Sequence, residues 1–493
     1  MRRPLLLAGG LLLAAVVVLA ALVPARSARL ASRQPEVPPA PRRAVDPGAI
    51  ERLAGALRFR TISYQDSARF PVAEFAGLES YLRGAFPHVH AALAREAVGE
   101  RGVLYTWPGA DATRPPIVLM AHMDVVPVEP GTEARWQQPP FGGTVSGGYV
   151  WGRGALDDKV NVLAELEAVE GLLRAGFRPS RTVYLSFGKD EEVGGTGARA
   201  VAGELRRRGV RPAFILDEGG AIFPAAVPGL AAPAALVGIA EKGSVSVELA
   251  VPSAGGHSSM PPRETPVGIL ARALVRLQDH PMPARLDGPA RAMFEYVAPE
   301  LGGVARATFA NLWLTKGLVE GRLAASPATD AMIRTTTAPT MLAGSPKENV
   351  LPARPTAVVN FRIRPGDTVD GVLAHVREVV ADPRVRIAPL HNFTSNPSHV
   401  SDPAAPEFRL LQRSIREVFP GTVVAPYLVV GGTDSRHFEG LTANIYRFMP
   451  IRVAPSDLER LHGTDERVPV DSYLDAVRFY DRLLRAAAGV PTR

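Results

Sequence analysis

The sequence predicts an α/β fold with a mostly parallel central sheet flanked by helices, into which a smaller α+β domain is inserted. Its 493 residues are more than one ordinary hydrophobic core accommodates, so at least two domains are expected. Apolar strand patterns alternate with helical patterns up to about Gly243, which is typical of a parallel sheet. Beyond Gly243 the strands alternate between apolar and polar residues, as half-buried strands do.

The first half of the chain gives these elements in order. Residues 50–59 form an amphipathic helical pattern and residues 160–173 a second helix, while short apolar runs predict strands at 117–120, 182–187 and 214–216. Histidine or acidic residues follow each of the three strands. Because ligands bind beyond the carboxyl ends of parallel strands, we expect these polar side chains to meet at one edge of the sheet.

The inserted domain is predicted from the change in pattern. In residues 244–251, Val245, Val247 and Leu249 alternate with polar residues, so one face of this strand is buried. The remaining elements are helices at 266–279 and 369–380, strands at 357–363 and 385–388, and a helix at 407–418 that returns to the first domain. The predicted division is a hydrophobic signal or anchor (1–25), a linker (26–47), a first segment of the larger domain (48–243), the smaller domain (244–392) and a second segment of the larger domain (393–493). Only the family resemblance given below implies that the larger domain is catalytic and that the smaller one is a lid and dimerisation domain.

Composition excludes several classes of protein. The net charge of +7 comes largely from arginines in the first 50 residues, and no basic stripe with interleaved aromatic residues follows. No nucleic-acid partner is therefore expected. The chain has no cysteine, so disulfides, thiolate nucleophiles and cysteine-ligated metals are excluded.

The N-terminus predicts export. Arg2 and Arg3 precede an apolar, uncharged run over residues 4–24, which is about as long as a membrane span. Small residues around 25–31 also fit a signal peptide, although the long apolar core favours an uncleaved anchor. A buried core helix is the alternative. A Pro-rich linker follows at 32–47. We expect the N-terminal segment to contact a membrane and the protein to be membrane-anchored, periplasmic or secreted.

Acidic and histidine residues are the candidates for chemistry. An acidic doublet alone is usually solvated surface or a helix cap, but these lie together beyond apolar strands. Grouped carboxylates raise one another's pKa unless a cation neutralises them, and two divalent ions would do so. Oxygen and imidazole ligands without thiolate suit zinc, with cobalt or manganese as alternatives. The candidates are His122 with Asp124, Asp157 with Asp158, Glu191 with Glu192, Asp217 with Glu218, and His462.

Five ordered motifs carry a family resemblance that covers roughly residues 47–484. The chain resembles the M20 metallopeptidase family, which has a zinc-exopeptidase-like fold, and within it the carboxypeptidase S and N-fatty-acyl-amino-acid synthase/hydrolase branch. The motifs are MAHMDVVP (120–127), WGRGALDDK (151–159), KDEEVGG (189–195), ILDEGG (215–220) and GGHSSMPP (255–262).

The resemblance implies a ligand set for two metal ions. His122 and Glu218 would bind the first ion, Glu192 and His462 the second, and Asp157 would bridge both. Asp217 is the alternative to Glu218, since adjacent residues of an extended segment face opposite ways.

The resemblance also implies roles for two further carboxylates and four residues that would contact substrate. Glu191 would be the general base that takes a proton from a water shared by the metals, and Asp124 would fix the tautomer of His122. His257 would stabilise the oxyanion, often from the partner subunit of a homodimer, unless it only caps its Gly/Ser-rich turn. Asn349, Arg362 and Arg436 match substrate-contacting positions, with Arg364 close enough to be confused with Arg362.

Three functions follow from the residues and the resemblance. The first is hydrolysis of an amide or peptide bond beside a free carboxylate, in a short peptide or an N-acyl amino acid. The second is reversible condensation of a fatty acid with an amino acid. The third, a non-catalytic binding or dimerisation module, requires lost ligands, and none is missing. A dinucleotide-binding enzyme is disfavoured because no G-x-G-x-x-G follows the first strand.

Overall fold

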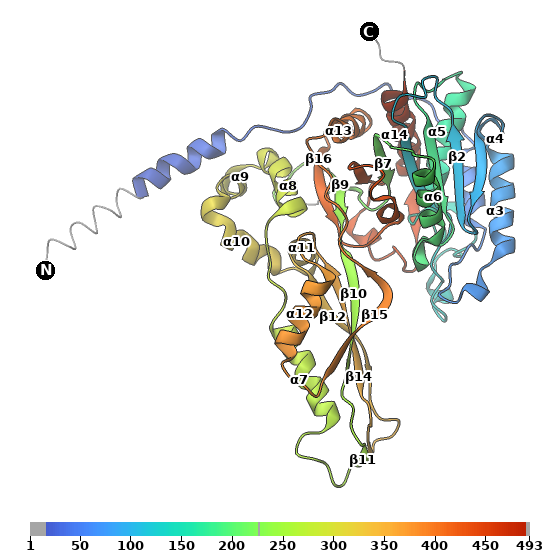
Figure 1. Cartoon of the computed structure of the whole chain (residues 1–493). Coiled ribbons are helices and arrows are strands. Elements are labelled where there is room, and N and C mark those ends of the chain that lie inside the picture. The colour runs from blue at the N-terminus through green and yellow to red at the C-terminus, as the bar shows by residue number, and fades with distance from the viewer. Residues whose placement is uncertain (1–15, 225–226, 490–493) are drawn as a thin grey trace.

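A computed structural model describes residues 16–224 and 227–489 of the chain. Figure 1 shows a larger α/β unit and an elongated smaller unit that extends from it. The strands of the larger unit run in the order β1-β2-β6-β3-β7-β17-β9-β16, and β8 pairs with β9. These strands are β1 (Ala94–Val98), β2 (Gly102–Trp107), β3 (Ile117–His122), β6 (Val183–Gly188), β7 (Phe214–Asp217), β8 (Ile222–Phe223), β9 (Ala234–Glu241), β16 (Val423–Val429) and β17 (Ile445–Arg447).

The centre of this sheet is parallel. β3 pairs in parallel with β6 and β7, β7 with β17, and β9 with β16, whereas the pairings of β1 with β2, β2 with β6, and β9 with β8 and β17 are antiparallel. All six residues of β3 are buried, as expected for a central strand covered on both faces. The predicted α/β class with a mostly parallel sheet is thus confirmed.

Helices cover the two faces of the large sheet, and the alternation of side chains along β3 decides which core each residue joins. Ile117 and Leu119 pack in the main core with α5 and α14, while Val118 and Met120 pack with α6 on the other face. The helices of this unit are α2 (Ala49–Leu57), α3 (Val72–Ala85), α4 (Pro87–Ala92), α5 (Lys159–Arg174), α6 (Thr196–Arg207), α13 (Pro406–Val418) and α14 (Val470–Ala488). A small sheet, β18-β5-β4, lies beside them, formed by β4 (Thr144–Ser146), β5 (Tyr149–Trp151) and β18 (Arg467–Pro469).

The smaller unit is a four-stranded antiparallel sheet in the order β12-β14-β10-β15. Helices α7 and α12 pack on one face through the alternating apolar residues that the sequence predicted for β10. Both helices begin where predicted, because the Thr265 and Thr368 hydroxyls accept the Gly268 and Gly371 N–H groups as N-caps. The elements are β10 (Gly243–Ala250), β12 (Thr336–Ala343), β14 (Thr356–Ile363), β15 (Arg386–Ser395), α7 (Pro266–Asp279) and α12 (Val369–Val380), with the short pair β11 (Gly256–His257) and β13 (Val350–Leu351) at the far tip.

Four helices that the sequence did not predict interrupt this smaller unit. They are α8 (Gly288–Val297), α9 (Gly303–Ala310), α10 (Leu312–Ala324) and α11 (Pro327–Ile333). Met293, Phe294 and Val297 of α8 belong to the main core of the larger unit. This segment therefore packs on the larger unit, although its residues lie inside the range expected for the lid.

The two units join at a narrow neck. β9 of the large sheet continues into β10 of the small sheet with only Lys242 between them. The Lys242 ammonium donates to the carbonyls of Ala331 at 2.9 Å and Arg334 at 2.8 Å. A Cβ at Gly243 would lie 2.4 Å from the carbonyl oxygen of Ser395, so the outgoing and returning chains touch at a position that only glycine fits.

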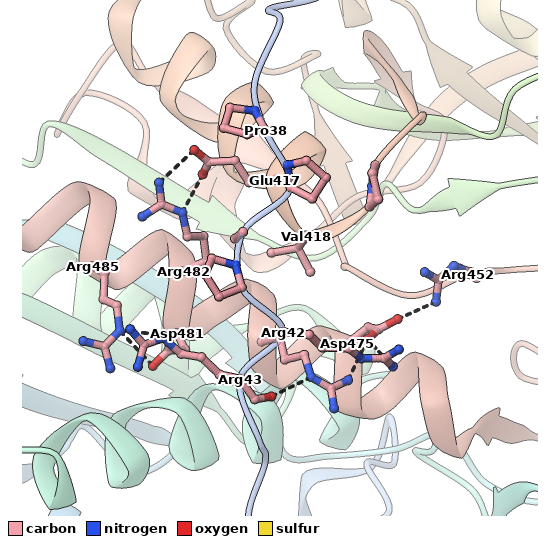
Figure 2. A pocket seen from close by; sticks show the side chains of 15 residues that line it. Pro38, Arg42, Arg43, Glu417, Val418, Arg452, Asp475, Asp481, Arg482 and Arg485 are labelled. Carbon is pink, nitrogen blue, oxygen red and sulfur yellow. Dashed lines mark hydrogen bonds and ion pairs between the residues drawn. The ribbon is translucent and has the colours of Figure 1, made fainter.

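The segment that precedes α2 lies along the larger unit. Residues 16–28 are helical, and residues 30–46 contain no helix or strand. Figure 2 shows residues 38–43 crossing α13 and α14, where they close a pocket of about 620 Å³ lined by salt-bridged arginines. The Ala40 N–H donates to the Glu417 carbonyl at 2.8 Å. The predicted linker is thus attached to the surface of the larger unit.

Residues 1–15, which make up much of the predicted apolar segment, lie outside the described part of the chain. Over residues 16–224 and 227–489, none of the helices has both the length and the apolar character that a bilayer crossing requires.

Candidate metal centre

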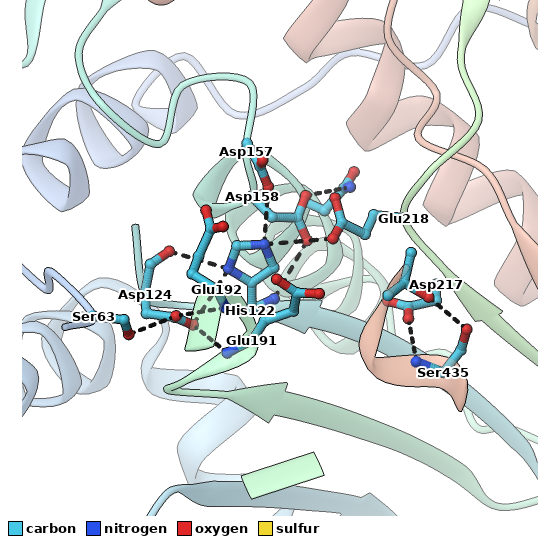
Figure 3. Close-up of polar contacts among 12 residues, drawn as sticks. Ser63, His122, Asp124, Asp157, Asp158, Glu191, Glu192, Asp217, Glu218 and Ser435 are labelled. Carbon is cyan, nitrogen blue, oxygen red and sulfur yellow. Dashed lines mark hydrogen bonds and ion pairs between the residues drawn. The ribbon is translucent and has the colours of Figure 1, made fainter. Parts of the chain in front are cut away.

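The predicted chemical residues meet at the carboxyl edge of the large sheet. His122 ends β3, Glu191 and Glu192 follow β6, and Glu218 follows β7. Figure 3 shows these side chains converging on one point with Asp157, which lies in the loop before α5. The expectation that the strand ends bring these groups together is confirmed by this arrangement.

Asp157 lies between the two histidines. Its Oδ1 is 2.9 Å from Nε2 of His122, and its Oδ2 is 2.9 Å from Nε2 of His462. Glu218 Oε1 is 3.5 Å from the same His122 nitrogen, and Glu192 Oε1 is 3.3 Å from the His462 nitrogen. One carboxylate is therefore shared between a His122 and Glu218 cluster and a His462 and Glu192 cluster.

The two members of the Asp217–Glu218 doublet point in different directions. Glu218 faces His122, whereas Asp217 Oδ2 accepts the backbone N–H of Ser435 at 2.8 Å. Asp217 is thereby engaged in holding the loop after β16, and only Glu218 reaches the cluster (Figure 3). The geometry favours Glu218 as the ligand.

Asp124 orients two parts of the site. Its Oδ1 is 3.4 Å from Nδ1 of His122, on the far side of the imidazole from Asp157. The same carboxylate accepts the Ser63 hydroxyl at 2.6 Å and the backbone N–H groups of Glu191 and Glu192 at 3.1 and 3.2 Å. Asp124 thus ties the imidazole of His122 to the turn that carries both glutamates, which is how an outer carboxylate fixes a ligand.

Glu191 lies beside an arginine of the loop after β16. Arg436 Nη2 is 3.9 Å from Glu191 Oε1, and Arg436 Nε is 3.7 Å from Glu241 Oε1. The other oxygen of Glu241 accepts the Thr433 N–H at 3.0 Å and the buried Arg447 Nε at 3.0 Å. Buried contacts therefore position this loop, which places a guanidinium beside the candidate base.

Burial and mutual repulsion govern the charges here. Burial raises the pKa of Glu218 to about 8, and the charge of Asp157 adds to this shift. Burial also raises the pKa of Glu191 well above its usual value. Hydrogen bonds to Asp157 and Glu192 raise the pKa of His462 to about 10. These carboxylates therefore require positive charge close to them.

The residues present fit divalent cations. Two overlapping groups have ligand atoms within 4.8 Å of one another, namely His122 with Asp158 and Glu218, and His122 with Asp157 and Glu192. All ligands are imidazole or carboxylate, the set that zinc, cobalt and manganese accept. A divalent cation at each cluster would supply the positive charge that these carboxylates require.

The sequence did not assign roles to two residues that contribute to this site. Asp158 accepts the backbone N–H of His122 at 3.3 Å and the amide of Asn161 at 2.6 Å, so it holds the end of β3. Glu466 is fully buried, and its Oε1 accepts the N–H groups of Gly154, Leu156 and Asp157 at 2.7 to 3.1 Å. The sequence pointed to the Asp157–Asp158 doublet as a candidate for chemistry. A lone glutamate in a polar loop, such as Glu466, has no sequence pattern that marks it.

Glu466 joins the two loops that carry Asp157 and His462. Its Oε2 accepts Nη1 of the buried Arg153 at 2.7 Å, and Nη2 of Arg153 donates to the carbonyls of His462 and Gly463 at 3.1 and 2.9 Å. The pair therefore fixes the distance between the shared carboxylate and the second histidine. Neither residue contacts the cluster with its own side chain, so both are positioning residues.

We expect Glu466→Gln to weaken metal binding at the His462 side by about 10- to 100-fold, because the ligand loops lose their common anchor. Unfolding free energy should also fall by about 3–5 kcal/mol, since Arg153 is left buried without its carboxylate. Isothermal titration with zinc and a denaturant melt measure the two effects. Glu417→Gln, which breaks the Glu417–Arg482 pair between α13 and α14, is the matched control. Equal zinc affinity in both variants would contradict the positioning role.

Three predicted substrate residues lie apart from the cluster. His257 is exposed at the tip of the small unit, where its Nδ1 accepts the Ser259 N–H at 3.2 Å, so Nε2 carries the proton. Asn349 lies beside it, since its carbonyl accepts the Ser258 N–H at 3.1 Å. Arg362 lies on β14 at the open face of the small sheet. Within one chain, Arg436 lies beside the cluster, whereas His257 and Asn349 do not.

Comparison with known proteins gives the family. Residues 118–486 match Peptidase family M20/M25/M40. The probable carboxypeptidase S-like 2 of Dictyostelium discoideum is 41% identical over 440 residues, covering 88% of this chain and 84% of that protein. The N-fatty-acyl-amino acid synthase/hydrolase of Xenopus tropicalis is 40% identical over 442 residues, covering 88% and 85%.

A solved structure supports the fold. The M20 family metallo-carboxypeptidase of Sulfolobus solfataricus aligns over 89% of this chain and 98% of its own, with a TM-score of 0.64 and 16% identity. At that identity the likeness concerns the fold alone. The family match and the two relatives decide the classification: this chain belongs to the M20 family of metallopeptidases and amidohydrolases, as the sequence motifs predicted.

Proposed function

We propose that this M20 enzyme hydrolyses an amide bond that lies beside a free carboxylate, in an N-acyl amino acid or a short peptide, with zinc as its metal. The observation that carries the proposal is Asp157, which each histidine contacts through a different carboxylate oxygen. Glu191 stands next to this cluster and Arg436 next to Glu191. A paired metal site, a carboxylate base and a carboxylate-binding cation are the parts that such a reaction needs.

Two arginines are proposed to bind the free carboxylate of the substrate. Arg362 makes no side-chain hydrogen bond or ion pair with any residue in the described ranges. Although the Arg362 side chain is exposed, neighbouring protein atoms and the charge of Arg436 lower the pKa of Arg362, as expected for two cations that lie near each other. Arginine binds a carboxylate through two parallel hydrogen bonds. An anionic substrate group between Arg362 and Arg436 would relieve their repulsion.

The chain's own residues then divide the work. Divalent cations would polarise the scissile carbonyl and make water acidic enough to ionise near neutral pH. Glu191 accepts the proton from the attacking water and delivers it to the leaving nitrogen. Burial favours this role, because it raises the pKa of the Glu191 carboxyl well above its usual value and so makes the carboxylate a stronger proton acceptor. Asp124 keeps the imidazole of His122 in place throughout.

A matched substrate panel tests the proposal. The zinc-loaded full chain is assayed with N-acetyl-phenylalanine, N-oleoyl-phenylalanine and a dipeptide, each beside its carboxamide-capped counterpart. We expect capping to lower kcat/KM by about 100-fold, because two charge-assisted hydrogen bonds are lost. Arg436→Gln should reduce this preference to about tenfold, since Arg362 remains, while leaving the capped substrates almost unaffected. Equal rates for free and capped substrates would exclude a carboxylate-directed enzyme.

The long-acyl member of the panel addresses the second candidate, reversible condensation of a fatty acid with an amino acid. The similarity to an N-fatty-acyl-amino acid synthase/hydrolase supports this candidate. If it holds, the enzyme given oleate and phenylalanine forms the same N-acyl product that it cleaves. Hydrolysis of short-acyl substrates and dipeptides without any condensation would instead favour an ordinary exopeptidase.

A homodimer would complete the site. The placement of His257 and Asn349 at the tip of the small unit supports a site in which a partner supplies both residues. His257→Ala is expected to lower kcat by about 100-fold through loss of an oxyanion donor. Co-expression of His257→Ala with Glu191→Gln should restore about a quarter of wild-type activity, because one site in each mixed dimer is intact. No recovery would place His257 in its own chain's site.

Export is proposed from the sequence alone. Arg2, Arg3 and the apolar run that follows them support an exported protein held at a membrane or released into the periplasm or medium. Fractionation of cells with an antibody to the C-terminal helix would locate the protein, and the mass of its N-terminal peptide would show whether the segment is cleaved.

A further inference from the structure

An apolar patch lies on α9 and α10, outside the site and away from the main core. Val304 is 84% exposed, Leu318 66%, Trp313 53% and Leu314 52%. Leu314 and Leu318 are four residues apart and share one face of α10. Monomeric proteins seldom gather large exposed apolar side chains in this way without a binding partner.

The N-terminal helix, residues 16–28, is attached to this patch. Arg306 donates to the carbonyls of Ser27 at 2.9 Å and Leu30 at 2.7 Å, and Asn311 donates to the Val23 carbonyl at 3.3 Å. The guanidinium of Arg26 stacks over the Trp313 ring at 5.9 Å. Figure 1 shows this helix reaching outward beside α9 and α10.

The N-terminal helix continues the apolar surface. Val17 is 60% exposed, Val16 and Val18 are each 53% exposed, and Leu22 is 44% exposed. In the sequence, residues 4–15 before it carry no charge. In the sequence, helix 16–28 therefore follows directly on a segment that is itself suited to hydrocarbon.

Basic residues surround this surface. Residues 16–34 contain Arg26, Arg29 and Arg33 and no acidic residue, and all three arginines are exposed. In α10, Lys316 and Arg322 are exposed and outnumber Glu320. Apolar side chains bordered by arginine and lysine suit the interface of an anionic bilayer, where the apolar groups enter the acyl boundary and the cations meet headgroups.

We propose that α9, α10 and helix 16–28 together form a docking surface for an anionic lipid bilayer, so that the catalytic unit itself rests on the membrane. This goes beyond the proposed amidase activity and beyond a simple N-terminal tether. We choose a lipid surface as the occupant for two reasons. Helix 16–28 follows an uncharged apolar segment in the sequence, and the arginine and lysine residues around the surface give it positive charge. Two copies of this basic face would repel each other, whereas anionic headgroups attract it.

Trp313 provides a direct probe of the docking surface. Of the four tryptophans, Trp107, Trp136 and Trp151 are 5%, 8% and 6% exposed, so only Trp313 can respond to contact with lipid. The full-length zinc enzyme is mixed with phosphatidylglycerol–phosphatidylcholine vesicles whose acyl chains are brominated near the carbonyl. Trp313→Phe gives the emission of the buried tryptophans, which is subtracted.

The expected result is a blue shift and quenching of the Trp313 emission by brominated lipid, together with protection from aqueous iodide. Both effects should weaken as phosphatidylglycerol is replaced by phosphatidylcholine. If the protein floats with the vesicles but Trp313 remains accessible to iodide and is not quenched by bromine, the N-terminal segment alone binds the membrane. That outcome refutes the docking surface. Protection without lipid that grows with protein concentration would identify a second copy as the occupant and also overturn the proposal.

A pair of variants separates docking from catalysis. Leu314→Ser with Leu318→Ser is expected to weaken vesicle binding by about tenfold or more, because two leucines no longer enter the acyl boundary. Val267→Ser with Val275→Ser, two exposed valines on α7, is the matched control. Both double variants should hydrolyse N-acetyl-phenylalanine at the wild-type rate, so loss of docking is distinguishable from failure of the proposed function. Equal vesicle binding by the two double variants would contradict the docking surface.

Discussion

Glu191→Gln is expected to lower kcat by about 10³-fold while the bound metal is unchanged. The amide keeps the volume of the side chain but cannot accept the proton from the attacking water. Glu191 makes no short contact with either histidine, in contrast to Glu192, Glu218 and Asp157. The loss should therefore appear in kcat with KM almost unchanged, measured with N-acyl-phenylalanine at saturating zinc.

Glu192→Gln is the control for this variant, because it changes the adjacent residue of the same turn. Glu192 lies 3.3 Å from His462 Nε2, so its amide variant should lose metal as well as activity. Metal analysis by mass spectrometry separates the two variants. If Glu191→Gln also loses metal, or if it retains most of its activity, Glu191 is not the base.

Asp157→Asn is expected to remove both metals and reduce hydrolysis to the level of the blank. Each carboxylate oxygen of Asp157 faces a different histidine at 2.9 Å, so an amide necessarily turns an N–H₂ toward one of them. Although burial opposes the shift, hydrogen bonds from His122 and His462 lower the pKa of Asp157, which keeps this carboxylate charged. The change therefore removes a real negative charge.

Asp158→Asn tests whether the neighbouring aspartate carries the same role. Burial and the charge of Glu218 raise the pKa of Asp158 well above its usual value, in contrast to the lowered pKa of Asp157. Its oxygens accept from the His122 backbone and Asn161. We expect this variant to retain most of its zinc. If Asp158→Asn loses the metals and Asp157→Asn keeps them, the shared ligand has been assigned to the wrong residue of the pair.

The sequence predicts elements well wherever local chemistry fixes their ends. Helices 266–279 and 369–380 match α7 and α12, because a threonine N-cap starts each one. The strand at 214–216 extends by one residue as β7, since buried aliphatic residues and the following acidic pair define it. Strand β9, which lies next to the edge strand β16, was missed, because its run of alanine, glycine and short aliphatic residues has no period of two.

The site shows the same division between local and long-range information. Motifs near the ends of elements pointed to His122 at the end of β3, Glu191 and Glu218 shortly after β6 and β7, and Asp157 shortly before α5, because each lies within a few residues of an element that positions it. Glu466 could not be found in this way, since its role depends on backbone N–H groups about 310 residues earlier in the chain. Helices α8–α11 were missed for a related reason. Their apolar residues pack partly against the distant larger unit, and the rest face outward.

The neck at Gly243 lies close to Arg362, one of the two arginines that we propose to bind the substrate carboxylate. Arg362 pairs with Ser244, one residue beyond the neck on the small sheet, whereas Arg436 belongs to the large unit. The outgoing and returning chains touch at Gly243, so a rotation of the small unit about this point moves Arg362 by only a short arc, while His257 at the far tip moves by a long one. Such a rotation would therefore keep the two arginines that we propose to bind the substrate carboxylate at a nearly constant distance, while it moves His257, the proposed oxyanion donor, over a much longer path.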